Sequence, residues 1–308
     1  MLWECNTFDE YADKIREADA LSLMTSPATQ RCDFARLWLY QTVLQFGAGA
    51  SGTVVHGKTR SDAYFLFLQS QERANPAVFD GRVIKWPEIV VVPPARDFTF
   101  ASTGMMQWIS LCLPTELANT TFDFNSYPGS VGNGKTLIKP LAAELTEFTD
   151  AATAARKRMQ RARPKPSVDL PAIEAALLAM LKSILANSAR NGRSFDARTE
   201  QVMAKVLECL ANNNRINVLA LSEAAGVSER TLHRAFRKYF HMGPKRYLKI
   251  RQLNLVRSAF RRNHSARSSI TEILMEHGVT EFGRFAIEYK ALFRESPVET
   301  LQKSRFAN

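Results

Sequence analysis

The C-terminal third of this 308-residue chain contains one helix-turn-helix pattern twice, in residues 219–238 and 270–290. In the first copy, Gly226 provides a turn position that tolerates a positive φ angle. Ser228 follows it as a cap for the next helix. A short helix, a glycine turn and a capped second helix define the motif. Two copies in one segment constrain this third of the chain to an all-α fold.

The second helix of each copy has a predictable inner and outer side. Leu232 and Phe236 are four residues apart, so both face inward. The residues left facing outward are Arg230, Thr231, His233, Arg234 and Arg237. The second copy repeats the plan with a turn residue, a cap and two anchors: Gly278, Thr280, Phe285 and Tyr289. A helix presented in this way enters the DNA major groove, so the pattern predicts binding to double-stranded DNA.

The charge distribution agrees with a polyanionic partner. Residues 190–308 carry 22 Lys or Arg and 11 Asp or Glu, whereas residues 1–189 have no net charge. Within that neutral part, residues 1–150 have a net charge of −5 and residues 151–189 a net charge of +5. Positive charge concentrated in one segment is typical of nucleic-acid binding.

A single helix is expected between the two motifs. Pro244 favours a helix start, and apolar residues recur at roughly helical spacing through residue 262. A helix over 245–262 would be about 27 Å long. It could hold two recognition helices near the repeat of B-DNA, roughly 34 Å.

This segment resembles the C-terminal domain of the AraC/XylS family of transcription regulators. The matching positions include Ala225-Gly226, Tyr247, Arg251, Phe293 and Ser296-Pro297. The resemblance implies two helical subdomains joined by a linker helix, with both recognition helices contacting bases. Mapped onto this chain, the candidate DNA contacts are Ser228, Glu229, Arg230, Thr231, His233, Arg234, Arg237, Thr280, Glu281, Phe282, Gly283 and Arg284.

The second motif departs from the family pattern at three positions: Gly283 in place of Ser, Ile287 in place of Arg, and Tyr289 in place of Phe. We expect it to depend more on phosphates and DNA shape than on base edges. Glu229 and Glu281 fit helix-start acids better than cytosine contacts. Phe282 is open to two interpretations, a core residue or a thymine-methyl contact.

Residues 129–136 match the phosphate-loop string G-x-x-x-x-G-K-[ST]. The chemistry needs a strand before the loop and a helix after it. Pro128 precedes the glycines directly, and Pro140 falls where that helix would continue. A glycine-rich surface turn is favoured, and a nucleotide-dependent enzyme stays an alternative.

A basic run at 156–166 has two interpretations. Basic, proline-containing runs are usually solvated linkers. Its arginines could instead bind an anionic effector such as a cyclic dinucleotide, and sugars, aromatic acids and amino-acid derivatives stay open. The candidate effector contacts are Arg156, Arg158, Arg161 and Arg163.

A short heptad pattern follows, formed by Leu170, Ile173, Leu177, Met180 and Ile184. A packed helix of the body would show the same spacing. We favour a dimerisation seam, because a homodimer multiplies affinity for paired half-sites.

Residues 1–150 are rich in short β-branched or aromatic runs, at 36–46, 63–68, 82–84, 88–92 and 106–113. Such runs predict a small barrel or sandwich, and the resemblance implies a cupin-like barrel that binds a small effector. His56 is the only histidine in this region, so no metal is expected. Trp38, Tyr40, Tyr64 and Trp108 line a pocket or belong to the core.

The combined prediction is an α+β protein in three parts: a β-rich effector domain at 1–150, a basic linker with a dimerisation helix at 151–199, and a DNA-binding domain at 200–308. We expect a cytoplasmic, sequence-specific regulator that acts as an activator, with RNA polymerase as a partner and no cofactor. No signal-peptide core, ~18-residue apolar run or catalytic motif is found, so neither a membrane span nor an enzyme is expected. An effector-independent architectural DNA protein is the other alternative.

Overall fold

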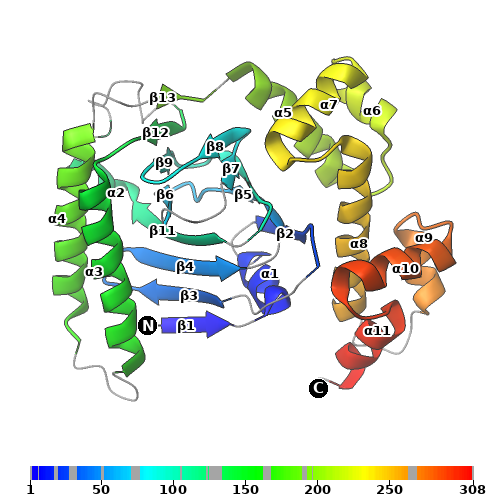
Figure 1. The fold of residues 1–308 in the computed structure, drawn as a ribbon, viewed down its shortest axis with the longest axis horizontal. Helices are drawn as coiled ribbons and strands as arrows, with labels where there is room; N and C mark the ends of the chain where they lie inside the picture. The colour runs from blue at the N-terminus through cyan, green and yellow to red at the C-terminus, as the bar shows by residue number, and fades with distance from the viewer. Residues whose placement is uncertain are drawn as a thin grey trace.

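The computed structural model describes residues 2–5, 7–16, 20–27, 33–49, 52–70, 77–104, 106–122, 124, 134–161, 168–188, 193–195, 197–262 and 269–306. Two antiparallel sheets form the N-terminal part, and helices form the C-terminal part (Figure 1). The predicted α+β class, with a β-rich N-terminal region and an all-α C-terminal region, is confirmed.

The larger sheet, sheet A, has the strand order β1-β3-β4-β11-β6-β9-β12-β13. Its strands are β1 (Leu2–Cys5), β3 (Asp33–Trp38), β4 (Val43–Gly49), β6 (Ala63–Gln69), β9 (Ile89–Val92), β11 (Met106–Pro114), β12 (Thr136–Ile138) and β13 (Arg193–Ser194). Sheet B has the order β2-β5-β10-β7-β8. Its strands are β2 (Ala20–Met24), β5 (Thr53–Lys58), β7 (Ala77–Phe79), β8 (Arg82–Ile84) and β10 (Asp97–Ser102).

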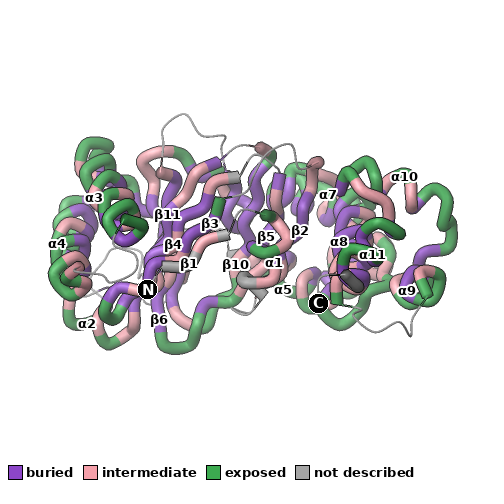
Figure 2. The backbone as a smooth tube through the Cα atoms, turned by 90° about the horizontal axis from the view of Figure 1, so that it is seen from below, coloured by how far each residue is buried: buried purple, intermediate pink, exposed green. Residues whose placement is uncertain are grey.

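Successive side chains of each strand face opposite sides, and both sides of both sheets are apolar. In sheet A, Leu66 and Leu68 face outward, while Phe67 faces the space between the sheets. The outer face of sheet A is covered by α2 (Thr115–Phe122), α3 (Ala142–Arg161) and α4 (Leu170–Ser188). Figure 2 shows many buried residues in the strands and exposed residues along α3 and α4.

Helix α4 is held to the sheet by one buried carboxylate. Glu174 Oε2 accepts hydrogen bonds from the backbone N–H of Gln41 and Thr42 and from Thr42 Oγ1, at 2.8, 2.7 and 2.8 Å. By length and composition alone, α4 could cross a membrane. Its apolar side, including Leu181 and Leu185, instead belongs to the core of the N-terminal part.

The C-terminal helices are α5 (Ala197–Asn212), α6 (Val218–Ala225), α7 (Glu229–Phe240), α8 (Pro244–Arg262), α9 (Ile270–Glu276), α10 (Phe282–Phe293) and α11 (Pro297–Phe306). The local signals behave as predicted in the first motif, where Gly226 has φ +66° and Ser228 caps α7. Gly278 also has a positive φ, +71°. Thr280 is not the cap of α10, because Glu281 occupies that position and makes no side-chain cap bond.

The N-terminal part contains more structure than the sequence pattern indicated. All five predicted runs form strands, but 36–46 is a hairpin of β3 and β4 rather than one strand. Helix α1 (Phe8–Arg16) and strands such as β5 and β10 were not anticipated. The predicted boundary at 150 falls inside α3, and the one at 199 falls inside α5.

The outer face of sheet B packs directly on the first helix-turn-helix unit. Leu23, Val54 and Val78 share one hydrophobic cluster with Leu232 and Phe236 of α7. Strand β2 is the edge of sheet B, and α8 covers it. The amide of Asn254 accepts from Met24 N–H and donates to Met24 O, both at 2.9 Å, as a neighbouring strand would.

Polar side chains reinforce this junction at two places. At the first place, His56 Nε2 lies 2.6 Å from the hydroxyl of Tyr247 on α8. Burial lowers the pKa of His56 to about 3, so its ring is neutral. The Lys135 ammonium lies 2.6 Å from Asp80 Oδ2 and 3.2 Å from Glu200 Oε1 of α5. Burial raises the pKa of Asp80 to about 6, against the opposing effect of Lys135.

This raised pKa predicts a pH-dependent difference in stability between the native chain and Asp80→Asn. Between the ordinary pKa of 3.8 and about 6, folded Asp80 keeps a proton that the unfolded chain has lost. The native chain should therefore lose up to ~3 kcal/mol of unfolding free energy, relative to the variant, as the pH rises through that window. Asparagine suits position 80, where φ is +45°.

Urea unfolding of both proteins at several pH values from 4.5 to 7 measures the difference. The interaction of the Asp80 carboxylate with Lys135 is already contained in the pKa of Asp80, so it needs no separate correction. A difference that grows in favour of the native chain with rising pH would show that the ion pair, not burial, controls Asp80.

Candidate nucleic-acid interface and ligand cavity

Helix α7 presents a basic outer face. Ser228 Oγ accepts from the Thr231 N–H at 3.3 Å and fixes the start of the helix. Leu232 and Phe236 are fully buried, as predicted. The exposed side chains on the other side are Glu229, Arg230, His233, Arg234 and Arg237. The structure therefore brings these predicted contacts onto one accessible surface, with Thr231 half-buried beside them.

Helix α8 connects the two units as a fixed rod. Its 19 residues match the predicted helix and give a length of about 28 Å. Arg251, one of the positions that carry the family resemblance, is buried and donates to Leu210 O and to Asn214 Oδ1. Gln252 donates to His277 O at 2.9 Å and ties α8 to α9. These contacts set the relative positions of α7 and α10.

Helix α10 presents a different outer face. Phe285 and Tyr289 are fully buried anchors, as predicted. Thr280, Glu281, Phe282, Gly283 and Arg284 are exposed. Arg284 is paired with Glu281 at 3.6 Å and with Glu288 at 3.2 Å. Phe282 is 37% exposed, so it is not a core residue.

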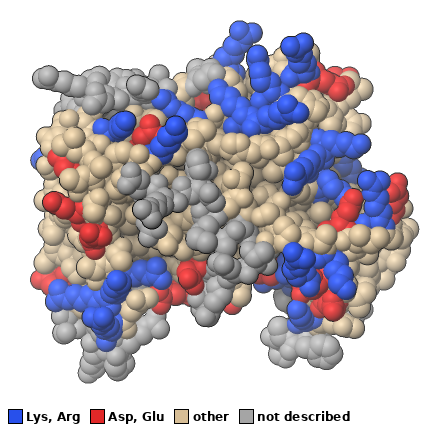
Figure 3. Space-filling model, viewed as in Figure 1, with Lys and Arg blue, Asp and Glu red and all other residues tan. Residues whose placement is uncertain are grey.

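The charge seen on the surface follows this division. Figure 3 shows Lys and Arg side chains gathered over the half of the molecule that holds α6 to α10. Fewer appear on the face of the sheets in the same view. Among the described residues, no group of three or more His, Cys, Asp and Glu could hold a metal ion.

A cavity of about 890 Å³ lies between the two sheets. This volume is within the usual range for small-molecule sites. Aromatic rings form much of its wall: Phe65, Phe67, Phe79, Phe98, Phe100 and Trp108. Phe98 stacks on Phe65 with ring centres 5.2 Å apart, and Trp108 lies 5.8 Å from Phe67. The cavity suits an apolar, planar molecule.

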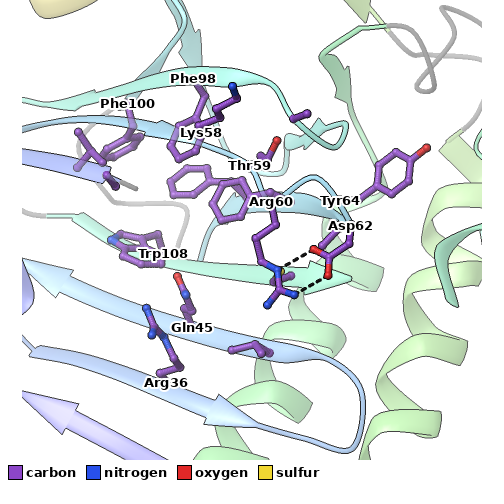
Figure 4. A pocket seen from close by; sticks show the side chains of 18 of the residues that line it. Arg36, Gln45, Lys58, Thr59, Arg60, Asp62, Tyr64, Phe98, Phe100 and Trp108 are labelled. Atoms are coloured by element: carbon purple, nitrogen blue, oxygen red, sulfur yellow. Dashed lines mark hydrogen bonds and ion pairs between the residues drawn. The ribbon is translucent and has the colours of Figure 1, made fainter. Parts of the chain in front are cut away.

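A few polar groups interrupt this wall. Figure 4 shows Arg36 and Gln45 pointing from β3 and β4 toward Trp108. At the mouth, Arg60 donates to both oxygens of Asp62, at 2.8 and 2.5 Å, and this pairing lowers the pKa of Asp62. Arg60 is thus neutralised, whereas Arg36 lies against the rings of Phe34 and Trp38, 5.8 and 5.6 Å from their centres.

Other predicted site residues lie away from this cavity. Arg156 pairs with Glu4 at 2.9 Å, and neither it nor Arg158 or Arg161 lines the cavity. Arg163 lies outside the described residues, as do residues 129–133 of the phosphate-loop string. Thr136 of that string begins strand β12, directly after Lys135, whereas the phosphate-binding chemistry would need a helix there.

The predicted dimerisation seam is corrected in part by burial. Leu177 and Ile184 are buried in the core of their own chain, so they cannot contact a second copy. Leu170, Ile173 and Met180 also pack against that core and are half-buried. The heptad spacing of α4 reflects its packing on sheet A.

The sequence pattern found part of the cavity. Trp38, Tyr64 and Trp108 line it, as one of the two interpretations predicted, whereas Tyr40 is 68% exposed. Arg36 and Phe98 were not singled out, because they come from strands far apart in the chain. Tyr11 of α1 also lines the cavity, and its segment carried no strand or motif signal.

Comparisons with known proteins concentrate on the C-terminal part. Residues 221–303 match a family model described as a helix-turn-helix domain. The XylDLEGF operon transcriptional activator of Pseudomonas putida is 34% identical over 106 residues, which cover 34% of this chain and 32% of that protein. A probable thc operon regulatory protein of Rhodococcus erythropolis is 35% identical over 91 residues, 30% of this chain and 27% of its own length.

This chain therefore spans about a third of the length of these curated relatives. Among solved structures, the match to the AraC-like transcriptional activator CuxR covers 83% of this chain and 94% of the CuxR chain, at 13% identity and a TM-score of 0.40. The match to a variant of ToxT from Vibrio cholerae covers 85% of this chain and 97% of the ToxT chain, at 10% identity and a TM-score of 0.36.

The matched residues contain both structural units described above, from α6 through α11. The relatives named here are transcription regulators, and the part of the chain that matches them is the helical C-terminal part. Residues 221–303 of this chain are a helix-turn-helix domain, and their similarity to the XylDLEGF operon transcriptional activator agrees with the predicted resemblance to the AraC/XylS family.

Proposed function

We propose that the whole chain is a sequence-specific transcription regulator whose DNA binding responds to a small molecule in the cavity between the sheets. The observation that carries the proposal is the exposed basic face of α7, presented on a rod that also fixes α10. Such a regulator would work in the cytoplasm. Activation, contact with RNA polymerase and homodimerisation stay predictions from the family resemblance.

Arg234 provides the test of DNA recognition. It lies exposed in the middle of the outer face of α7, where a guanidinium can donate two hydrogen bonds to guanine. Arg234→Ala should reduce affinity for a duplex selected by the full-length protein by about 1–3 kcal/mol, roughly fivefold to 150-fold. Fluorescence anisotropy with selected and random duplexes measures this.

Arg158→Ala is the matched control, because it removes the same charge from an exposed site on α3. It should leave the affinity for the selected duplex unchanged. Equal affinity of the native chain for selected and random DNA would instead support the architectural alternative.

For the effector, we propose a mostly apolar molecule with one acidic group. The aromatic wall fits the apolar part, and Arg36 is a lining cation whose side chain points toward Trp108. Arginine suits a carboxylate because its planar fork can donate two parallel hydrogen bonds. A cyclic dinucleotide at the basic end of α3 is the competing proposal, and Arg156 is already paired there with Glu4.

A thermal-shift panel of benzoate, naphthalene-2-carboxylate, decanoate and cyclic di-GMP decides between the two sites. An acid at a hundred times its dissociation constant should stabilise the protein by about 2.7 kcal/mol. Arg36→Ala should abolish this stabilisation, and naphthalene-2-carboxamide, which lacks the charge, should bind weakly.

The triple variant Arg156→Ala, Arg158→Ala, Arg161→Ala should respond to the acid as the native chain does. Stabilisation by cyclic di-GMP alone, lost in the triple variant, would overturn the cavity as the effector site.

Helix α1 offers a path from the cavity to the DNA-binding domain. Tyr11 lines the cavity, and two residues earlier Asp9 forms a two-point ion pair with Arg257 of α8, at 3.0 and 2.7 Å. Burial lowers the pKa of Arg257, but Asp9 outweighs it and raises that pKa above its ordinary value. Arg257 also donates to Glu295, 2.7 Å away, next to α11. A ligand that displaces Tyr11 would therefore move a charge held by α8.

Asp9→Ala should uncouple the two sites. The panel acid that stabilises the native chain most should still stabilise the variant, because Asp9 does not line the cavity. In the native chain, the bound acid is expected to change DNA affinity by roughly fivefold to 150-fold. In Asp9→Ala, the acid should change DNA affinity little or not at all. Asp150→Ala, an exposed carboxylate on α3, should keep the full effect. An undiminished effect in Asp9→Ala would exclude α1 as the path.

A further inference from the structure

The two recognition helices can be compared position by position within this one chain. Their buried residues correspond: Leu232 with Phe285, Phe236 with Tyr289, and Phe240 with Phe293. The same alignment relates the outward positions: Arg230 with Gly283, Arg234 with Ile287, and Arg237 with Lys290. Of these three outward cations of α7, two are thus replaced on α10 by residues that carry no charge and no side-chain hydrogen-bond donor.

The outward side of α10 is apolar near its start. Ile287 is 73% exposed and Phe282 is 37% exposed. Gly283 lies one turn before Ile287, and a Cβ atom added there would meet nothing within 4 Å. Phe282, Gly283 and Ile287, together with the half-buried Ala286, form what we call the apolar strip of α10.

The cation on this side of α10 is engaged within the protein. Arg284 forms ion pairs with Glu281 and Glu288. Glu288 also forms an ion pair with Lys249 of α8, at 2.6 Å. These carboxylates repel phosphate groups and hold the guanidinium along the helix. The apolar strip is therefore the part of α10 near its start that offers an uncharged, apolar contact to a base edge.

The major groove presents one apolar group, the C5 methyl of thymine. We propose that α10 recognises thymine methyl groups through Ile287 and Phe282, with Gly283 leaving room for close approach of the helix. This inference rests on the proposed DNA-binding function. It makes the two halves of the site chemically unlike, because α7 recognises hydrogen-bonding edges and α10 recognises methyl groups.

Substitution of thymine by 2′-deoxyuridine tests the inference, because it removes the methyl group and leaves the hydrogen-bonding edge intact. The full-length protein first selects a duplex from random DNA, and each thymine is then replaced singly. The native chain should lose about threefold to fivefold in affinity for each contacted methyl, at one or two thymines in one half of the site.

Ile287→Ala should bind the thymine duplex more weakly and lose its sensitivity to deoxyuridine at those positions. Val298→Ala shortens another exposed aliphatic side chain, on α11, and should keep the native sensitivity. Arg234→Ala should lower affinity for every duplex while keeping that sensitivity. Thermal unfolding of Ile287→Ala should match the native chain, since the side chain is exposed.

Two results would overturn the inference in distinguishable ways. If the native chain binds its selected duplex and no deoxyuridine substitution matters, or Ile287→Ala keeps the native sensitivity, α10 does not recognise methyl groups but the proposed function stands. If the chain selects no duplex at all, the proposed function and this inference fall together.

Discussion

The rest of the structure depends on the contact between the outer face of sheet B and the first helix-turn-helix unit. Strands β5, β7 and β10 alternate, so that Val55, Phe79 and Phe100 face the cavity while their neighbours pack on α5 to α8. One layer of backbone thus separates the ligand cavity from the core of the DNA-binding domain. A ligand that changes the spacing of these strands would act on both sides of the same sheet.

Local signals made the C-terminal third predictable. The glycine turns, the Ser228 cap and Pro244 each act within a few residues, and the structure places α6 to α8 where they indicated. The N-terminal part was predictable only as a class, because its strands pair over long distances. Strand β5 contacts β10 about forty residues later. Its own sequence has only three β-branched residues, Thr53 to Val55, before His56 and Gly57, and this run is too short to predict a strand.

The cavity and the candidate effector arginines could not be predicted for the same reason, because their contacts join residues that are distant in the sequence. Arg36 and Phe98 line the same cavity only because two sheets face each other, and neither has a local signal. The basic run at 156–166 suggested a linker, yet its first part is the end of α3, where Arg156 pairs with Glu4 over 150 residues away. In α4, heptad spacing could not distinguish a second chain from the chain's own sheet, because both need the same apolar stripe.

The turn between β7 and β8 packs closely against the first recognition helix, so a change in one restricts what the other can accept. Gly81 has φ +75°, and a Cβ there would lie 2.5 Å from the ring of Tyr239 on α7. A recognition helix that carries another side chain at position 239 would change this point of contact. Exchange of DNA-binding domains between such regulators would then need the turn and the helix to be transferred as a pair, so new promoter specificity is more readily gained by changes on the outer face of α7 or α10.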